Sequence, residues 1–168
     1  MQSESARAAS AAEARFRINH PNSRPRAIKV IALDRESEAV IKRLSRSGWT
    51  NASFLIALPS DPPRREPFSM RGWLSDLAGE ALNLAEEIDG ADLVVMIATA
   101  GSNTEAASII GEACSLKRVM TTGLILAEPS VSDAALSRSL SQLRPWALML
   151  VVASGEEYIA DMLTALRA

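Results

Sequence analysis

The chain has 168 residues, 48% of them apolar, and 18 basic residues nearly balance 20 acidic ones for a formal net charge of −2. This length and composition suit one domain with a real core, and no window approaches the roughly 18 apolar residues of a membrane span, so no membrane association is expected. One cysteine and one histidine exclude a disulfide framework, a Cys/His zinc site and a His-based catalytic triad; with no secretory signal, they favour a cytoplasmic protein with no metal site.

Residues 1–26 are predicted to form a disordered basic tail ahead of a single α/β domain over residues 27–168. The tail is rich in Ala, Ser and Arg, contains the lone His20, and offers few apolar side chains to bury. Its arginines are not densely clustered and lack interleaved aromatic residues, so the pattern does not favour nucleic-acid binding.

Five apolar runs of strand length follow the tail. They are Ala27–Leu33, Ala52–Leu58, Ala91–Ala98, Val119–Leu126 and Trp146–Ala153. Each run is nearly continuous rather than alternating, as expected when helices cover both faces of a parallel sheet. The sequence therefore predicts a three-layer, doubly wound, mostly parallel five-stranded sheet of the Rossmann-like class.

Amphipathic segments of helical spacing lie between and after these strands. The clearest runs from Leu74 to Ile88, and a last helix is expected around Ile159–Leu166. Gly48 and Gly90 stand where helices should end. Cys114 recurs among apolar residues at helical spacing, which predicts a buried thiol rather than a reactive one. The proline-rich segment from Pro59 to Met70 is predicted to be a loop, either a flap over the sheet edge or a solvated excursion.

The loops that follow the strands are the expected ligand site, because ligands of such sheets bind beyond the carboxyl ends of the strands. The candidate binding residues in these loops are Asp34, Ser37, Thr99, Gly101, Ser102, Asn103, Thr104, Glu128, Ser154 and Gly155. Every helix start here carries carboxylates. Ser102-x-x-Glu105 and Ser154-x-x-Glu157 each fit a capping box, in which the acidic side chain accepts hydrogen bonds from free backbone N–H groups.

This acidic edge argues against phosphate binding. Phosphate loops need glycines, so that bare backbone N–H groups approach the oxygens, and usually a lysine or arginine. The loop Asp34–Glu38 has no glycine. Paired carboxylates could instead hold a divalent cation or an amine; the candidates Asp34, Glu36, Glu105 and Glu128 come from separate loops, so this alternative depends on their geometry.

Several segments, taken in order over residues 28–168, resemble the nucleotide-binding half of the FtsZ/tubulin family. They are Ile28–Ile31, Ala39–Leu44, Ser53–Ala57, Glu86–Val95, Thr99–Gly101, Ala106–Glu112 and Thr122–Ile125. The resemblance implies a nucleotide-binding frame with two glycine-rich phosphate loops. Here the first loop reads Asp34–Glu38 and the second is shortened to Ser102–Glu105, so the resemblance implies the fold and carries over no catalytic residue.

Three functions stay open at this point. The first is a non-GTPase binding or assembly module that presents its edge or a helix face to a small molecule or a protein subunit, including another copy of itself; Trp73 and Leu82, which stand off the main apolar faces, add support for self-association. The second is an enzyme, or a metal- or amine-binding protein, that uses the acidic edge. The third is a nucleotide binder that uses backbone donors near Gly101 and Gly155. No complete catalytic motif is present, and no cofactor can be named.

Overall fold

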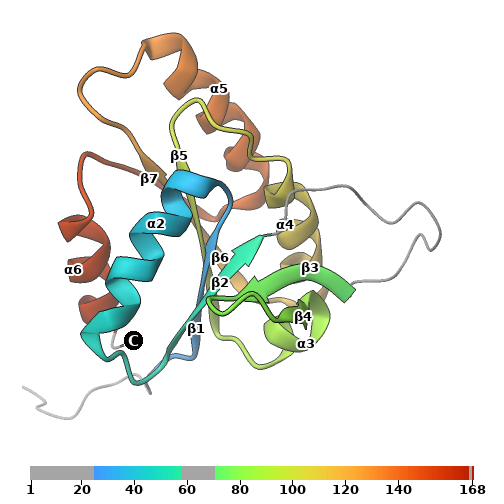
Figure 1. The fold of residues 1–168 in the computed structure, drawn as a ribbon. Coiled ribbons are helices and arrows are strands. Elements are labelled where there is room, and N and C mark those ends of the chain that lie inside the picture. The colour runs from blue at the N-terminus through green and yellow to red at the C-terminus, as the bar shows by residue number, and fades with distance from the viewer. Residues whose placement is uncertain (1–24, 58–70, 167) are drawn as a thin grey trace, which may run out of the picture.

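The computed structural model describes residues 25–57, 71–166 and 168 (Figure 1). Residues 1–24 of the predicted tail lie outside these ranges, as does the predicted loop from Pro59 to Met70. The side chain of Trp73 also lies outside what is described.

Within the described residues, seven strands form one sheet in the order β4-β3-β2-β1-β5-β6-β7. The strands are β1 (Ile28–Ala32), β2 (Ala52–Ala57), β3 (Arg71–Asp76), β4 (Ala81–Asn83), β5 (Leu93–Thr99), β6 (Met120–Leu126) and β7 (Met149–Ala153). The pairs among β2, β1, β5, β6 and β7 are parallel, and β3 and β4 extend the sheet in antiparallel fashion beside β2. The five parallel strands are the five predicted from the apolar runs.

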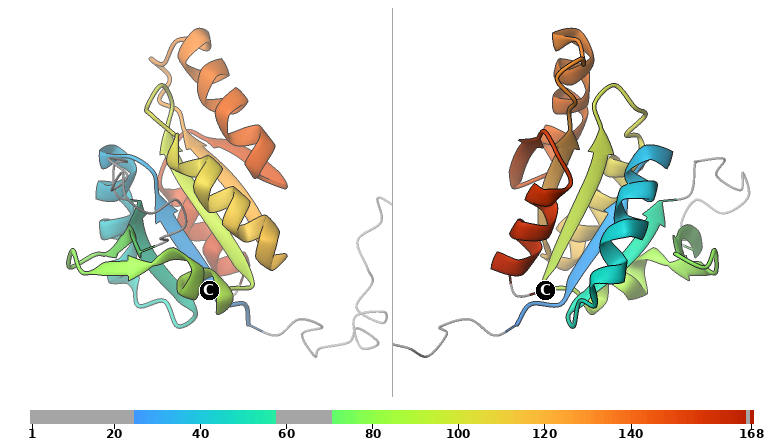
Figure 2. Two further views of the ribbon diagram at one scale, coloured as in Figure 1. Left: turned by 90° about the vertical axis from the view of Figure 1, so that its right-hand side faces the viewer. Right: turned by 60° about the vertical axis from the view of Figure 1, so that its left-hand side comes forward.

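Helices cover both faces of the sheet, as predicted. They are α2 (Arg35–Leu44), α3 (Leu84–Asp89), α4 (Ala106–Lys117), α5 (Asp133–Leu143) and α6 (Glu157–Ala165), with 3₁₀ turns η2 (Ser45–Ser47) and η3 (Arg144–Trp146). Figure 2 shows α4 and α5 in front of the sheet in one view and α2 and α6 in front of it in the other. Each face has its own buried core, one around Met96 and Ile110 and the other around Ile41 and Ile159. The three-layer, Rossmann-like class is therefore confirmed.

The helix predicted from Leu74 to Ile88 is wrong for most of its length. Residues 71–83 form the β3–β4 hairpin, and helix α3 occupies only the last turn and a half of the predicted span. Asp76 decides this, because its Oδ1 accepts hydrogen bonds from the backbone N–H groups of Ala78 and Glu80, and Gly79 supplies a φ of 92°. In the described residues the sheet therefore has seven strands instead of five, and Leu82 packs against the core rather than standing off it.

The chain order creates a switch point between β1 and β5. After β1 the chain builds β2 and the hairpin on one side, and it then returns to the other side of β1 to add β5, β6 and β7. In open α/β sheets this reversal leaves a crevice at the carboxyl ends of the two central strands. Two predicted helix ends are also confirmed. Gly48 closes η2 in the left-handed conformation, and Gly90 ends α3.

Candidate functional site

The carboxylate of Asp34 occupies the switch point. Asp34 follows β1 and caps the N-terminus of α2. Its Oδ1 accepts hydrogen bonds from the N–H groups of Glu36 (3.0 Å) and Ser37 (2.9 Å), and from the hydroxyl of Thr99 (3.1 Å). Its Oδ2 accepts from the N–H of Thr99 (2.7 Å) and lies 2.9 Å from the hydroxyl oxygen of Ser102. One carboxylate thus joins the loop after β1 to the loop after β5.

Ser37 completes this cap from the other side. Its hydroxyl accepts from the N–H of Asp34 (3.2 Å) and lies 2.9 Å from the Asp34 carbonyl oxygen, and its side chain is buried. The two residues form a reciprocal capping box, which satisfies the backbone donors at the start of α2. Ser37 therefore has a structural partner and lines neither of the two cavities described below.

Both predicted capping boxes are wrong. Helix α4 begins only at Ala106, and neither its N-cap, Glu105, nor the N-cap of α6, Glu156, makes a side-chain capping bond. The hydroxyl of Ser102 lies within hydrogen-bond distance of Asp34 and of the carbonyl oxygen of Thr99 (2.7 Å) instead. Helix α4 begins too late for Ser102 to cap it, and the Ser102 hydroxyl lies between an acceptor in its own loop and Asp34 of the loop after β1, a tertiary partner that the local spacing does not reveal.

The rest of the loop after β5 is held by helix α5. The N–H of Gly101 donates to the hydroxyl of Ser139 (2.8 Å), and the Thr104 hydroxyl donates to Oε1 of Gln142 (2.5 Å). Asn103 accepts from a backbone N–H within its own loop. Asn103 and Thr104 therefore serve the loop and line neither cavity of this edge. Sequence reasoning missed Ser139 and Gln142, since they lie in a helix 38 residues further along the chain.

Two neighbouring cavities open around this network and share Thr99 and Glu36. The larger, about 730 Å³, lies between α2 and α6. Its lining includes the candidate residues Thr99, Glu128, Ser154 and Gly155. The smaller, about 470 Å³, lies between the start of α2 and α5 and is lined by the candidates Asp34, Thr99, Gly101 and Ser102. Seven of the ten candidate residues thus border one of the two cavities.

The larger cavity is acidic. It is lined by Glu36, Glu128, Glu156 and Glu157 against one cation, Arg43. Arg43 forms an ion pair with Glu156, with 3.1 Å between Nε and Oε2, and this hydrogen bond raises the pKa of Arg43. In the described ranges the carboxylates of Glu36, Glu128 and Glu157 form no ion pair. The cavity therefore presents an excess of negative charge.

The smaller cavity has basic side chains at its rim. Arg35, the first residue of α2, and Arg138 of α5 both line it, and both are exposed. Neither guanidinium has an ion-pair partner in the part of the chain that the structure describes. Sequence reasoning missed these arginines, because the loops were read for carboxylates and glycines and Arg138 lies in a helix.

The described residues include no group of three or more His, Cys, Asp or Glu side chains arranged to hold a metal ion. The acids proposed for a cation, Asp34, Glu36, Glu105 and Glu128, are thus not gathered into such a group. No helix in these same ranges is both long and apolar enough to span a bilayer.

No protein-family model matches this chain, and no curated protein is similar to it. Among solved structures it is similar to translation elongation factor SelB from Methanococcus maripaludis in the apo form, with 11% identity and a TM-score of 0.45. The similarity covers 84% of this chain and 36% of the other, so the chain spans about a third of the length of that protein. The fold class given above rests on the sheet order and the layers themselves.

Proposed function

We propose that this protein is a binding or assembly module without GTPase activity, and that its site lies beside Asp34 at the switch point. The observation that carries the proposal is the Asp34 network. In phosphate-binding loops of α/β proteins, bare backbone N–H groups at a helix N-terminus receive the anion. Here the N–H groups of Glu36, Ser37 and Thr99 are already donated to a carboxylate of the chain itself.

A nucleotide phosphate would have to displace that carboxylate. The competitor is covalently tethered, accepts four hydrogen bonds from Glu36, Ser37 and Thr99, and carries the same sign of charge as the phosphate. The N–H of Gly101, a second candidate donor, is held by Ser139. These two facts also weigh against a nucleotide binder that uses backbone donors near Gly101.

The resemblance of the sequence to the FtsZ/tubulin family belongs to this proposal. In such a chain the family's fold is kept, and Asp34–Glu38 replaces the first phosphate loop. Asp34 would then join the loops after β1 and β5 at the place where the family binds a nucleotide. Asp34 would then be an internal substitute for the ligand, and the frame would serve binding or assembly.

The alternative function is an enzyme, or an amine- or metal-binding protein, that uses the acidic edge. The observation that favours it is the 730 Å³ cavity between α2 and α6, where three carboxylates have no ion-pair partner among the described residues. An organic cation such as a diamine would neutralise these carboxylates. Coulomb attraction to several carboxylates in a concave site is stronger than to one on an open surface.

One screen tests both readings. A fluorescent GTP analogue is titrated into the protein, and we expect no saturable binding in the micromolar range; a saturable isotherm that unlabelled GTP competes away refutes the main proposal. A panel of diamines is then tested by thermal shift, since a ligand at 100 times its dissociation constant stabilises by roughly 2.7 kcal/mol.

Matched variants assign any diamine shift to the cavity. Glu128→Gln should abolish a shift that arises there. Glu112→Gln, at an exposed carboxylate on α4 outside this cavity, should preserve it. The absence of any diamine shift in the parent protein removes the amine-binding alternative and leaves the main proposal standing.

A further inference from the structure

No strand in the described part of the chain pairs with the outer side of the last strand of the sheet. In the described ranges the sheet order ends at β7, which pairs only with β6. The carbonyl oxygen of Ala153 accepts from the N–H of Ala127 (2.9 Å), so Ala153 faces β6. Because alternate residues of a ladder face opposite neighbours, Leu150 and Val152 turn their N–H and C=O groups away from β6. These groups are available to another strand.

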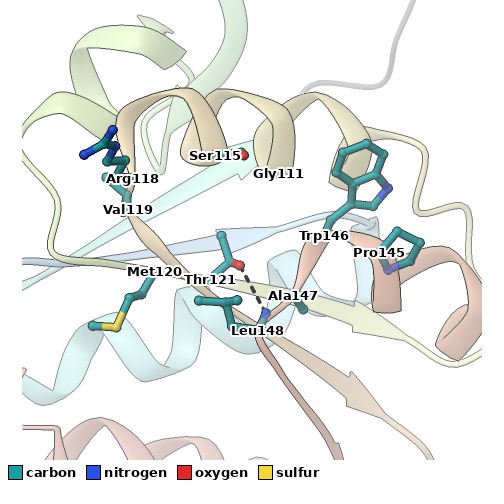
Figure 3. Close-up of a pocket in the computed structure, with 10 residues that line it drawn as sticks. All are labelled: Gly111, Ser115, Arg118, Val119, Met120, Thr121, Pro145, Trp146, Ala147 and Leu148. Carbon is teal, nitrogen blue, oxygen red and sulfur yellow. Dashed lines mark hydrogen bonds between the residues drawn. The ribbon is translucent and has the colours of Figure 1, made fainter.

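Three apolar side chains along this edge are exposed. Leu148 is 80% exposed, Met149 47% and Val152 45%. Leu148, which directly precedes β7, lines a cavity of about 350 Å³ together with Trp146 and Met120 (Figure 3). Exposed apolar side chains at an unpaired sheet edge favour strand addition.

The opposite edge of the same sheet is protected against pairing. There β4 is only three residues long, and its register with β3 shifts between Arg71 and Leu74. Short strands and irregular register are the usual devices that stop a sheet edge from recruiting another strand. Strand β7 has a continuous register over five residues and contains no proline and no charged residue. The chain thus blocks one edge and leaves the other competent to pair.

We propose that β7 pairs with β7 of a second copy of this chain, antiparallel, about a twofold axis that passes beside Val151. In this register Val151 lies opposite Val151 of the partner subunit, and Leu150 lies opposite Val152 of the partner subunit. The outward N–H and C=O groups of Leu150 and Val152 then form four hydrogen bonds across the interface. The two seven-stranded sheets become one continuous sheet.

The charge distribution around β7 favours a second copy of this chain as the binding partner. The run from Pro145 to Ala153 is uncharged, so pairing it with itself brings no like charges together. Its two ends carry opposite charges, with exposed Arg144 before the strand and exposed Glu157 after it, and neither has an ion-pair partner in the described part of the chain. An antiparallel arrangement places the basic end of each copy beside the acidic end of the other.

Cysteine cross-linking tests the register. On the proposed axis the two residues at position 151 form a non-hydrogen-bonded pair with Cα atoms about 4.5 Å apart, within the range for a disulfide. Val151→Cys should therefore cross-link under mild oxidation into a disulfide-linked dimer. Val152→Cys is the control, because residue 152 is the more exposed of the two but faces residue 150 of the partner. The native Cys114 is fully buried and does not compete. Equal cross-linking of both variants, or none with Val151→Cys, overturns the proposal.

Sedimentation of the full chain tests the dimer without any disulfide. The parent protein should sediment as a dimer in the micromolar range, and Val152→Lys should sediment as a monomer with an unchanged circular dichroism spectrum, since a lysine on an edge strand opposes strand addition. Leu116→Lys, which charges an apolar side chain exposed on α4, should remain dimeric. A parent protein that is monomeric throughout this range refutes the proposal and leaves the function proposed for the Asp34 site untouched.

Discussion

Replacement of Asp34 by alanine should show whether this carboxylate stands in for an anion. The substitution removes the acceptor of three backbone N–H groups, those of Glu36, Ser37 and Thr99. Loss of an N-cap costs about 0.5–2 kcal/mol, and loss of a hydrogen bond to a charged group costs about 1.5–3 kcal/mol. Because the contacts share one carboxylate and the hydroxyls can turn to other acceptors, we expect a combined loss of about 3 kcal/mol rather than the full sum.

The same variant should gain an anion site that the parent lacks. With the carboxylate gone, the N–H groups at the start of α2 are free to receive sulfate or phosphate, as at other helix N-termini. Sulfate should therefore stabilise Asp34→Ala more than it stabilises the parent. The comparison between proteins is essential, because sulfate also stabilises folded proteins in general by exclusion from their surface.

The assay is urea unfolding with and without sulfate, for the parent and two variants. The matched control is Asp133→Ala, which removes an exposed carboxylate from the first turn of α5, where Ser132 provides the cap. This control should lose little stability and should respond to sulfate as the parent does. The reasoning fails if Asp34→Ala changes the unfolding free energy by less than about 0.5 kcal/mol, the scale of a neutral surface substitution, or if sulfate stabilises all three proteins equally.

Three further outcomes follow from other contacts. A Cβ on Gly111 would lie 2.5 Å from Cβ of Trp146, so Gly111→Ala should destabilise by about 1–3 kcal/mol in urea unfolding although alanine favours helices; a more stable variant would contradict the packing. Burial raises the pKa of Cys114 from its usual 9.0 to about 12, so the native state keeps a proton that the unfolded state releases. The unfolding free energy of the parent, relative to Cys114→Ala, should be flat below pH 9 and fall between pH 9 and 12 by up to about 1.4 kcal/mol per pH unit; a constant difference from pH 8 to pH 10 would count against this. Glu105→Ala should lower the unfolding free energy by less than about 0.5 kcal/mol, since Glu105 makes no capping bond, whereas Ser102→Ala should lower it by about 1 kcal/mol. The reverse order in urea unfolding would support a capping role for Glu105.

The two proposals concern different parts of one sheet and can fail separately. The Asp34 network lies at the carboxyl ends of the central strands, whereas the proposed dimer contact lies along the outer side of β7. Binding at the first is read by ligand-induced stabilisation, and assembly at the second is read by sedimentation and cross-linking.

The sequence by itself determined the parallel core and the loops that meet at the switch point. Five continuous apolar runs predicted the five parallel strands, because a strand covered on both faces has no polar side to show. The loops after the first and third of these runs supplied Asp34, Thr99 and Ser102 as candidates, since parallel strands bring their carboxyl ends to one edge. The structure brings these three side chains together.

Only the tertiary structure decided which partner each polar group takes. Asp34 and Thr99 are 65 residues apart, and the Ser102 hydroxyl lies between Asp34 and the Thr99 carbonyl oxygen instead of capping α4, which begins only at Ala106. The hairpin at residues 71–83 likewise replaced a predicted helix. Its apolar spacing fits a helix, but the Asp76 turn and the unpaired side of β2 fit a strand better. Local sequence patterns indicate which residues are buried. Which hydrogen-bond partner a polar group takes depends on elements that are far apart in the sequence and meet only in the folded protein.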